Sequence, residues 1–182
     1  MEISKVPFGT YKGEPVTKYI LTNDNGVQVG ILDFAGLLQS FKVPTKDGGK
    51  ADMILTSENL DEFTNNGFCT NRLIGRVAGR IADGKFSING NDYQIEQNEG
   101  KNALHGGTNG FYNHIWHVDS TEATNNSVSI TLSLTLSPEV DTYPGKMHVT
   151  ATYTLTNDDF LSLKMAATTD ADTLFNPTNH TY

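Results

Sequence analysis

Two of the five histidines, His105 and His180, stand in sequence contexts that suit proton transfer. His105 is followed by Gly106 and Gly107, and residues without a Cβ let backbone or a ligand come close to an imidazole. His180 follows Pro177, whose fixed φ would aim the next residues reproducibly. Because imidazole exchanges protons near neutral pH, both histidines are candidates for acid–base chemistry. The alternatives are a turn that merely contains a histidine and a histidine on a frayed terminus.

Two arginines precede these histidines in a glycine-rich stretch. Arg76 and Arg80 lie in a run that lacks both the Gly-Lys-Ser/Thr ending of a phosphate-binding loop and a Gly-x-Gly-x-x-Gly pattern. In an extended chain they would share one face, which could offer a guanidinium to the hydroxyls or ring oxygen of a polar ligand. The alternative is that both are surface residues or members of structural ion pairs.

Metal-dependent and covalent catalysis find little support in the sequence. His114 and His117 are three apart, so a strand would send them to opposite faces, and no His-Glu-x-x-His motif or cysteine cluster is present. Cys69 is the only cysteine and has no evident base beside it in the sequence, and no Gly-x-Ser-x-Gly elbow occurs. We therefore predict neither a metal nor another cofactor.

Strands with a period of two must position these residues. Apolar residues alternate with polar ones from Val128 to Leu136 and again from Met147 to Leu155. Asn-Gly turns predict hairpins over Val16–Phe34 and Phe86–Ile95. Further predicted elements are strands at Leu37–Val43, Ile115–Val118 and Leu161–Met165, and a short helix over Ser57–Phe63 capped by Ser57. The pattern predicts an all-β chain, a sandwich of antiparallel strands.

Length and composition exclude several classes of protein. A chain of 182 residues, 37% hydrophobic and 19% charged, fits one globular domain. A net charge of −8 with 13 scattered basic residues argues against nucleic acid or a membrane surface as a partner. No signal-peptide core or membrane-spanning stretch is found. Because a single cysteine fits a reducing compartment, we predict a cytoplasmic location.

Four motifs carry a family resemblance, because they stand in the order, and at about the separations, that they have in a known family. They are Val77–Gly84, Asn102–Gly107, Tyr143–Gly145 and Phe175–Tyr182. The chain resembles the aldose 1-epimerases (galactose mutarotases) over essentially its whole length. The resemblance implies a galactose mutarotase-like fold, which is a large twisted antiparallel β-sandwich or supersandwich. It also implies cofactor-free interconversion of the α and β anomers of galactose, glucose and related aldoses.

The resemblance implies particular roles for the candidate residues. His180 corresponds to the general acid that protonates the ring oxygen of the sugar, and His105 to a histidine that binds near that oxygen and assists. Arg80 corresponds to the arginine that hydrogen-bonds sugar hydroxyls, which leaves Arg76 structural. The implied partner is a small sugar such as galactose or glucose. A second copy of the chain, in a homodimer, is the other candidate partner. The remaining candidates for the pocket lining are Gly79, Asn102 and Tyr182.

The catalytic base has no counterpart in this sequence. In the family a late glutamate takes the anomeric proton and a later aspartate binds hydroxyls, and no Asp or Glu before Tyr182 stands in a matching context. We therefore expect residues 1–182 to form a single amino-terminal portion of an epimerase domain, incomplete and inactive alone. The alternative is a non-catalytic carbohydrate-binding module of the same fold. An epimerase relative for phosphorylated hexoses would need more basic residues around the pocket.

Overall fold

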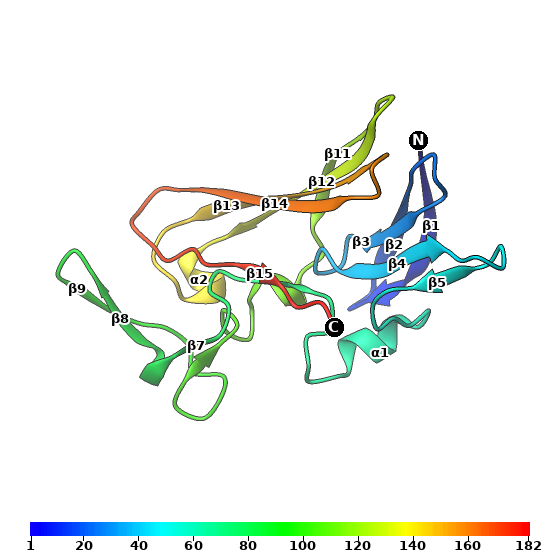
Figure 1. Ribbon diagram of the computed structural model, residues 1–182. Coiled ribbons are helices and arrows are strands. Elements are labelled where there is room, and N and C mark those ends of the chain that lie inside the picture. Colours follow the sequence, from blue (N-terminus) through cyan, green and yellow to red (C-terminus); the bar gives the residue numbers. More distant parts are fainter.

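The structure is a computed structural model that describes residues 1–182, and β-strands dominate it (Figure 1). The elements, in chain order, are β1 (Glu2–Tyr11), β2 (Glu14–Thr22), β3 (Gln28–Leu32), β4 (Leu38–Pro44), β5 (Lys50–Asp52), α1 (Leu60–Thr64), β6 (Leu73–Ile74), β7 (Arg80–Ile81), the 3₁₀ turn η1 (Ala82–Gly84), β8 (Lys85–Ile88), β9 (Asn91–Gln94), β10 (Ala103–Leu104), the 3₁₀ turn η2 (Phe111–Asn113), β11 (His117–Ala123), β12 (Ser127–Leu136), α2 (Pro138–Asp141), β13 (Met147–Thr156), β14 (Leu161–Thr169) and β15 (Thr178–Asn179). Neither α1 nor α2 has the length and apolar character that a helix needs to cross a membrane.

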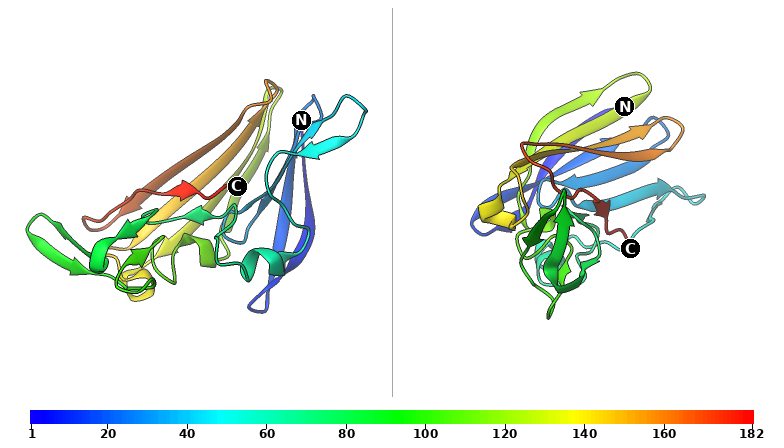
Figure 2. Two further views of the ribbon diagram at one scale, coloured as in Figure 1. Left: turned by 60° about the horizontal axis from the view of Figure 1, so that its bottom comes forward. Right: turned by 90° about the vertical axis from the view of Figure 1, so that its left-hand side faces the viewer.

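Two antiparallel sheets form the body of the molecule. One has five strands in the order β1-β2-β3-β4-β5, and the other has four in the order β11-β12-β13-β14. In Figure 2 the two sheets converge at the end that holds the N-terminus and splay apart toward the other end, where the middle of the chain lies. The predicted all-β class and antiparallel sandwich are confirmed.

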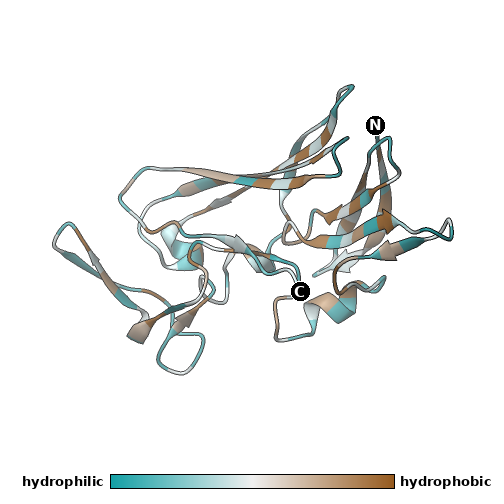
Figure 3. Ribbon diagram, viewed as in Figure 1, coloured by the Kyte–Doolittle hydropathy of each residue, from teal (hydrophilic) through white to brown (hydrophobic).

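The core lies between these two sheets because alternate residues of facing strands point inward. Val29 and Ile31 of β3 belong to the same buried cluster as Ile130 of β12 and Val149 of β13. Figure 3 shows apolar and polar residues alternating along the strands, as a sheet with one buried face requires. The hydroxyl of Tyr153 also crosses the core and donates to the carbonyl of Gly36 at 2.8 Å.

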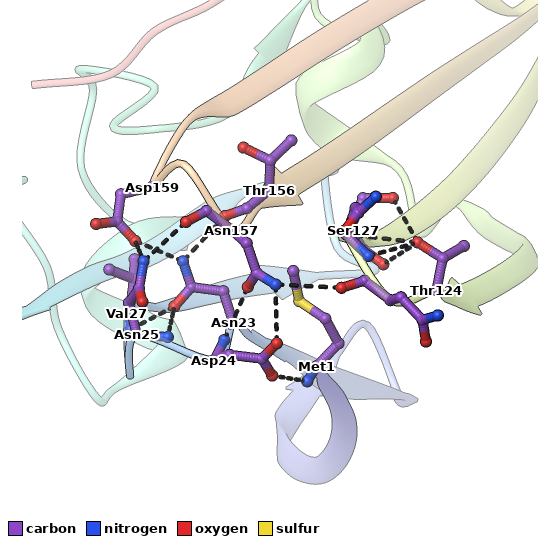
Figure 4. A network of polar contacts seen from close by, with 12 residues as sticks. Met1, Asn23, Asp24, Asn25, Val27, Thr124, Ser127, Thr156, Asn157 and Asp159 are labelled. Atoms are coloured by element: carbon purple, nitrogen blue, oxygen red, sulfur yellow. Dashed lines mark hydrogen bonds and ion pairs between the residues drawn. The ribbon is translucent and has the colours of Figure 1, made fainter.

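The end where the sheets converge is held by a polar network (Figure 4). The Nδ2 of Asn23, in the turn between β2 and β3, donates to the carbonyl of Thr156 at 3.0 Å and to Oδ1 of Asp159 at 2.6 Å. The backbone N–H of Asp24 donates to Oδ1 of Asn157 at 3.1 Å. These bonds join a turn of each sheet and fix the sheets relative to one another.

Most predicted elements are present, two need correction, and one strand was missed. The helix begins at Leu60, and its cap is Asn59, whose side chain accepts from the N–H of Asp61 at 3.0 Å. The predicted cap, Ser57, instead accepts from Asn59 N–H and shapes the turn before the helix. Trp116 lies before β11, buried, rather than within a strand over Ile115–Val118. β1 was not predicted because its residues are mostly exposed and show no apolar alternation.

Candidate active site

The loop that carries His105 depends on tight backbone packing. β10, directly before it, pairs with β7, so that Leu104 lies opposite Arg80. His105 has φ 56° and Gly106 has φ 91°, both in the left-handed region. A Cβ on Gly106 would lie 1.9 Å from the carbonyl oxygen of Gly75. The glycine after His105 therefore lets the loop lie directly on the Gly75 backbone.

Backbone contacts also set the proton position on His105. Gly79 N–H donates to Nδ1 of His105 at 3.1 Å, and His105 N–H donates to the carbonyl of Gly79 at 2.9 Å. Burial, helped by His180 and Arg80 and opposed by Glu99, lowers the pKa of His105 below its ordinary value. The neutral ring therefore carries its proton on Nε2, because Nδ1 accepts a hydrogen bond. His105 is prepared to donate from Nε2.

The segment that carries His180 is hydrogen-bonded along residues 71–78. β15 pairs with β6, and the N–H of His180 donates to the carbonyl of Arg72 at 2.9 Å. Asn179 extends this anchorage, since its Nδ2 donates to the hydroxyl of Tyr153 at 2.8 Å and to the carbonyl of Asn71 at 3.3 Å. His180 thus lies on a fixed backbone rather than on a frayed end.

These two segments bring the candidate histidines together. The rings of His105 and His180 meet edge to face, with their centroids 5.1 Å apart. The ring of Tyr182 stacks on His180 at 5.0 Å. All three side chains line one hollow with a volume of ≈ 400 Å³, which is within the ~300–1,000 Å³ that small-molecule sites commonly have. The whole lining is Thr64, Asn66, Gly67, Phe68, Cys69, Arg72, Asn98, Leu104, His105, Tyr112, Asn113, His180 and Tyr182.

Comparison with known proteins identifies the family. Residues 17–182 match the family model described as "Aldose 1-epimerase". The chain belongs to the aldose 1-epimerase family. The resemblance that the four motifs indicated is therefore confirmed.

Individual members of the aldose 1-epimerase family share both sequence and fold with this chain. It is 41% identical over 182 residues to a maltose epimerase of Levilactobacillus brevis, covering 100% of this chain and 53% of the relative. It is 33% identical to an aldose 1-epimerase of Streptococcus thermophilus, covering 100% of this chain and 52% of that one. The solved galactose 1-epimerase from Lactobacillus acidophilus superposes with a TM-score of 0.87 at 27% identity, again over 100% of this chain and 52% of the other. The chain therefore spans about half the length of the epimerases it matches.

Three of the six residues that the epimerase resemblance nominates do not line the hollow. Gly79 lies behind His105 and orients it. Arg80 is 58% exposed, and its Nε donates to Oε2 of Glu99 at 2.7 Å. Asn102 donates from its backbone to the carbonyl of Glu99 at 2.9 Å. Arg80, in β7, and Asn102, directly before β10, thus lie beside the His105 loop, and their contact with a ligand stays a prediction.

Arg76 has a structural role, as the sequence analysis predicted. Its side chain is fully buried, with Nε donating to Oδ2 of Asp141 at 2.6 Å and Nη2 donating to Oδ1 at 3.0 Å. The remaining hydrogen bonds go to the carbonyls of Pro144 and Gly145 and to the hydroxyl of Thr173. Arg76 and Arg80 do not share a face, because only Arg80 lies in a strand.

The structure adds one buried cation to the hollow that the sequence did not indicate. Arg72 is 3% exposed, and no carboxylate pairs with it. Its Nη1 donates to the carbonyl of Tyr112 and to Oδ1 of Asn113, both at 3.3 Å, and its Nη2 donates to the carbonyl of Phe63. Its Nε is buried without a partner. No spacing in the sequence marks Arg72, since its partners are Phe63 and the separate residues Tyr112 and Asn113.

Negative charge is missing from the hollow. None of its lining residues is an aspartate or a glutamate. Glu99 and Glu96, on the same stretch, are engaged elsewhere: Glu99 with Arg80, and Glu96 with the N–H of Thr108 at 2.9 Å. No group of three or more His, Cys, Asp or Glu side chains is placed so that it could hold a metal ion. The hollow presents proton donors and aromatic rings.

Proposed function

We propose that this chain forms the proton-donating side of an aldose 1-epimerase site, which interconverts the α and β anomers of aldohexoses such as galactose and glucose. The observation that carries the proposal is the meeting of His105 and His180, 5.1 Å apart, in one hollow. Because one relative is a maltose epimerase, we include reducing disaccharides of glucose among the candidate substrates.

His180 is the proposed general acid. A proton passes from its imidazole to the ring oxygen, the bond between that oxygen and C1 breaks, and the anomeric hydroxyl loses its proton as the C1 carbonyl forms. Rotation about C1–C2 and reclosure, with both protons returned, give the other anomer. An acid of this kind contributes about 10²–10⁴-fold to a rate. Backbone hydrogen bonds fix the main chain of His180, and the rings of His105 and Tyr182 pack against its imidazole, which supports the fixed geometry that such a transfer requires.

His105 and Arg80 are the proposed sugar-binding donors. With Nδ1 occupied by Gly79 N–H, the neutral His105 ring has its Nε2–H available for the ring oxygen or a neighbouring hydroxyl. Arg80 uses one edge of its guanidinium on Glu99 and retains further N–H groups for hydroxyls. In this arrangement Glu99 orients Arg80 rather than acting as the base.

The base that accepts the anomeric proton is proposed to lie in the part of the relatives that has no counterpart in this chain. The lining of the hollow holds no carboxylate, and the chain spans about half of each relative. Without a base opposite His180, the proton of the anomeric hydroxyl has only water to accept it. We therefore expect the 182-residue chain to bind sugar without accelerating its mutarotation appreciably.

Polarimetry on freshly dissolved α-D-galactose tests this expectation. The chain should leave the rate of mutarotation near that in buffer alone. The control for an active family member is the maltose epimerase of Levilactobacillus brevis, with α-maltose as substrate. A rate per molecule close to that of the control would show that the chain contains its own base, and would overturn this assignment of the missing group.

A second candidate function, a non-catalytic sugar-binding module, is favoured by the same absence of a carboxylate. Chemical rescue separates the two. If the site is an epimerase half-site, added formate should act as the base, so that chain and formate together exceed formate alone in polarimetry. The gain should disappear in His180→Gln. Sugar binding without any formate-dependent gain would favour the module.

A phosphorylated hexose is a poorer fit to the hollow. Arg72 is the only arginine or lysine in the lining, and it is almost fully buried. Both of its Nη groups donate to protein oxygens, so they are not free to form the paired hydrogen bonds that a phosphate accepts from arginine. Neutral sugars are the better match.

A further inference from the structure

One aromatic side chain at the hollow has no role in the reaction proposed above. Phe68 lines the hollow, yet 70% of it is exposed to solvent. A phenylalanine gains free energy when it leaves water, so a ring left open beside a binding site is available to a ligand. Phe68 lies between α1 and β6, outside every sequence motif of the chain.

The loop under Phe68 is braced. The N–H of Phe68 donates to Oδ1 of Asn66 at 3.2 Å, and the N–H of Arg72 donates to the carbonyl of Cys69 at 3.1 Å. Below the loop, the guanidinium of Arg72 bonds to the carbonyl of Phe63, in α1. The loop therefore holds the backbone of Phe68 at a defined place beside the hollow, which its side chain lines.

A row of three rings leads from His105 to Tyr182, and Tyr182 contacts the backbone of Phe68. His180 lies 5.1 Å from His105 and 5.0 Å from Tyr182, measured between ring centroids. The hydroxyl of Tyr182 then donates to the backbone carbonyl of Phe68 at 3.5 Å. Phe68 thus lies on the Tyr182 side of the hollow, displaced from the histidine pair.

This displacement fits the chemistry of a reducing disaccharide. The reacting atoms of a pyranose, C1 and the ring oxygen, must face the histidines. In a 1,4-linked disaccharide the second sugar is attached at C4, on the opposite side of the ring from C1. The second ring must therefore lie away from the histidines, and the C–H face of a pyranose packs on an aromatic ring.

We propose that Phe68 is the platform of a second sugar subsite, on which the non-reducing ring of a 1,4-linked disaccharide such as maltose stacks while the reducing ring faces His105 and His180. The assignment rests on the proposed function, because it needs a sugar in the hollow. It makes Phe68 a residue that determines specificity for disaccharides over monosaccharides and that takes no part in the proton transfers.

Ligand titrations of the 182-residue chain test the subsite. Saturation-transfer NMR would give dissociation constants for maltose and for glucose, in wild type and in Phe68→Ala. Maltose should bind several-fold more tightly than glucose, and Phe68→Ala should weaken maltose by about five- to tenfold while changing glucose by less than about twofold. Phe68→Tyr keeps the ring and should restore the preference for maltose.

Phe160→Ala is the matched control. Phe160 is likewise an exposed phenylalanine, 63% accessible, but it lies in the turn between β13 and β14 and not in the hollow. This variant should bind both sugars as wild type does, so any general effect of removing an exposed aromatic ring is subtracted.

The outcomes separate the subsite from the proposed function. Glucose binding together with equal effects of Phe68→Ala on both sugars would overturn the subsite and leave the epimerase site standing. An unchanged affinity for maltose in Phe68→Ala would do the same. Failure of wild type to bind either sugar would overturn the sugar site itself, and the subsite with it.

Discussion

Arg76 and Arg80 lie four residues apart on the same stretch and belong to two regions with opposite properties. Around Arg76, each guanidinium nitrogen donates a hydrogen bond to a protein oxygen, and the side chain is fully buried. Around Arg80 the side chain is 58% exposed and one carboxylate faces it. One region is closed to ligands, and the other is open.

The hollow extends the open region. His105 and His180 line it, and Tyr182 is 48% exposed. A site that binds a ligand must leave some hydrogen-bonding groups unsatisfied until the ligand arrives, whereas a structural brace must leave none. The same glycine-rich stretch is thus buried and fully hydrogen-bonded at its first arginine and exposed to solvent at its second.

Removing the Arg76 side chain should give the largest effect. Arg76→Ala leaves Asp141 buried without its partner, which commonly costs about 3–5 kcal/mol of folding free energy. Since this is a large fraction of a domain's stability, we expect the variant to be unfolded or strongly destabilised in urea denaturation followed by circular dichroism.

Arg80→Ala is the control for that change. Because Arg80 and Glu99 are exposed, the midpoint of urea unfolding should move little, while the affinity for galactose should fall. If both arginine variants unfolded at the same urea concentration, the division between a closed and an open region would be wrong.

Substituting Gly106 should destabilise the fold by less than removing the Arg76 side chain does. Gly106→Ala places a Cβ against the carbonyl oxygen of Gly75, and the backbone must move because φ is already 91°. Overpacking of this kind costs about 1–3 kcal/mol and should displace His105 from His180. Thermal unfolding would report the stability, and the His105 ring signals in NMR would report the displacement.

Gly90→Ala is matched to it in backbone conformation. Gly90, in the β8–β9 turn, has φ 79°, but nothing lies within 4 Å of the position of its Cβ. The two variants share the left-handed strain, so only the close approach to Gly75 distinguishes them. Equal losses of stability would mean that the packing of the His105 loop on Gly75 contributes nothing.

The smallest expected effect is the pH dependence that His105 confers. Its pKa is lower in the folded protein than the ordinary value of 6.5, mainly through burial and with contributions from His180 and Arg80. As pH falls below 6.5 the unfolded chain takes up this proton first, so stability is lost between 6.5 and the lower folded pKa and is unaffected above 6.5. Urea unfolding at pH 7.5 and pH 5.5 should show a larger loss in wild type than in His105→Gln. Equal losses in both would contradict this assignment.

The sequence predicted the sheets well because their signal is local. Alternation along β12 and β13 and the two Asn-Gly turns required only neighbouring residues, and each predicted strand pair is present. The edge strand β1 lacks this signal, since few of its residues are buried. The helix cap depended on which polar side chain reached the N–H of Asp61, and Asn59 does so rather than Ser57.

The candidate site was predictable only in the part that motifs carry. His105, His180 and Tyr182 lie in motifs, and the fold brings them into one hollow. Arg72 and Phe68 could not be found in this way, because they lie outside the motifs and the hollow that they line is completed by η2 and the C-terminal segment, which are distant in sequence. Arg80 is exposed and paired with Glu99, 19 residues further along the chain, and no local pattern encodes this pair.

The proposal that His105 and His180 face a bound sugar is tested most directly by titrating the ¹⁵N-histidine-labelled chain with galactose and following all five imidazoles by NMR. The Nε2 signals of His105 and His180 should shift together and saturate, while the signals of the three histidines outside the hollow, His114, His117 and His148, stay in place. No shift at His105 and His180, or an equal shift at all five histidines, would contradict a sugar site built on this pair.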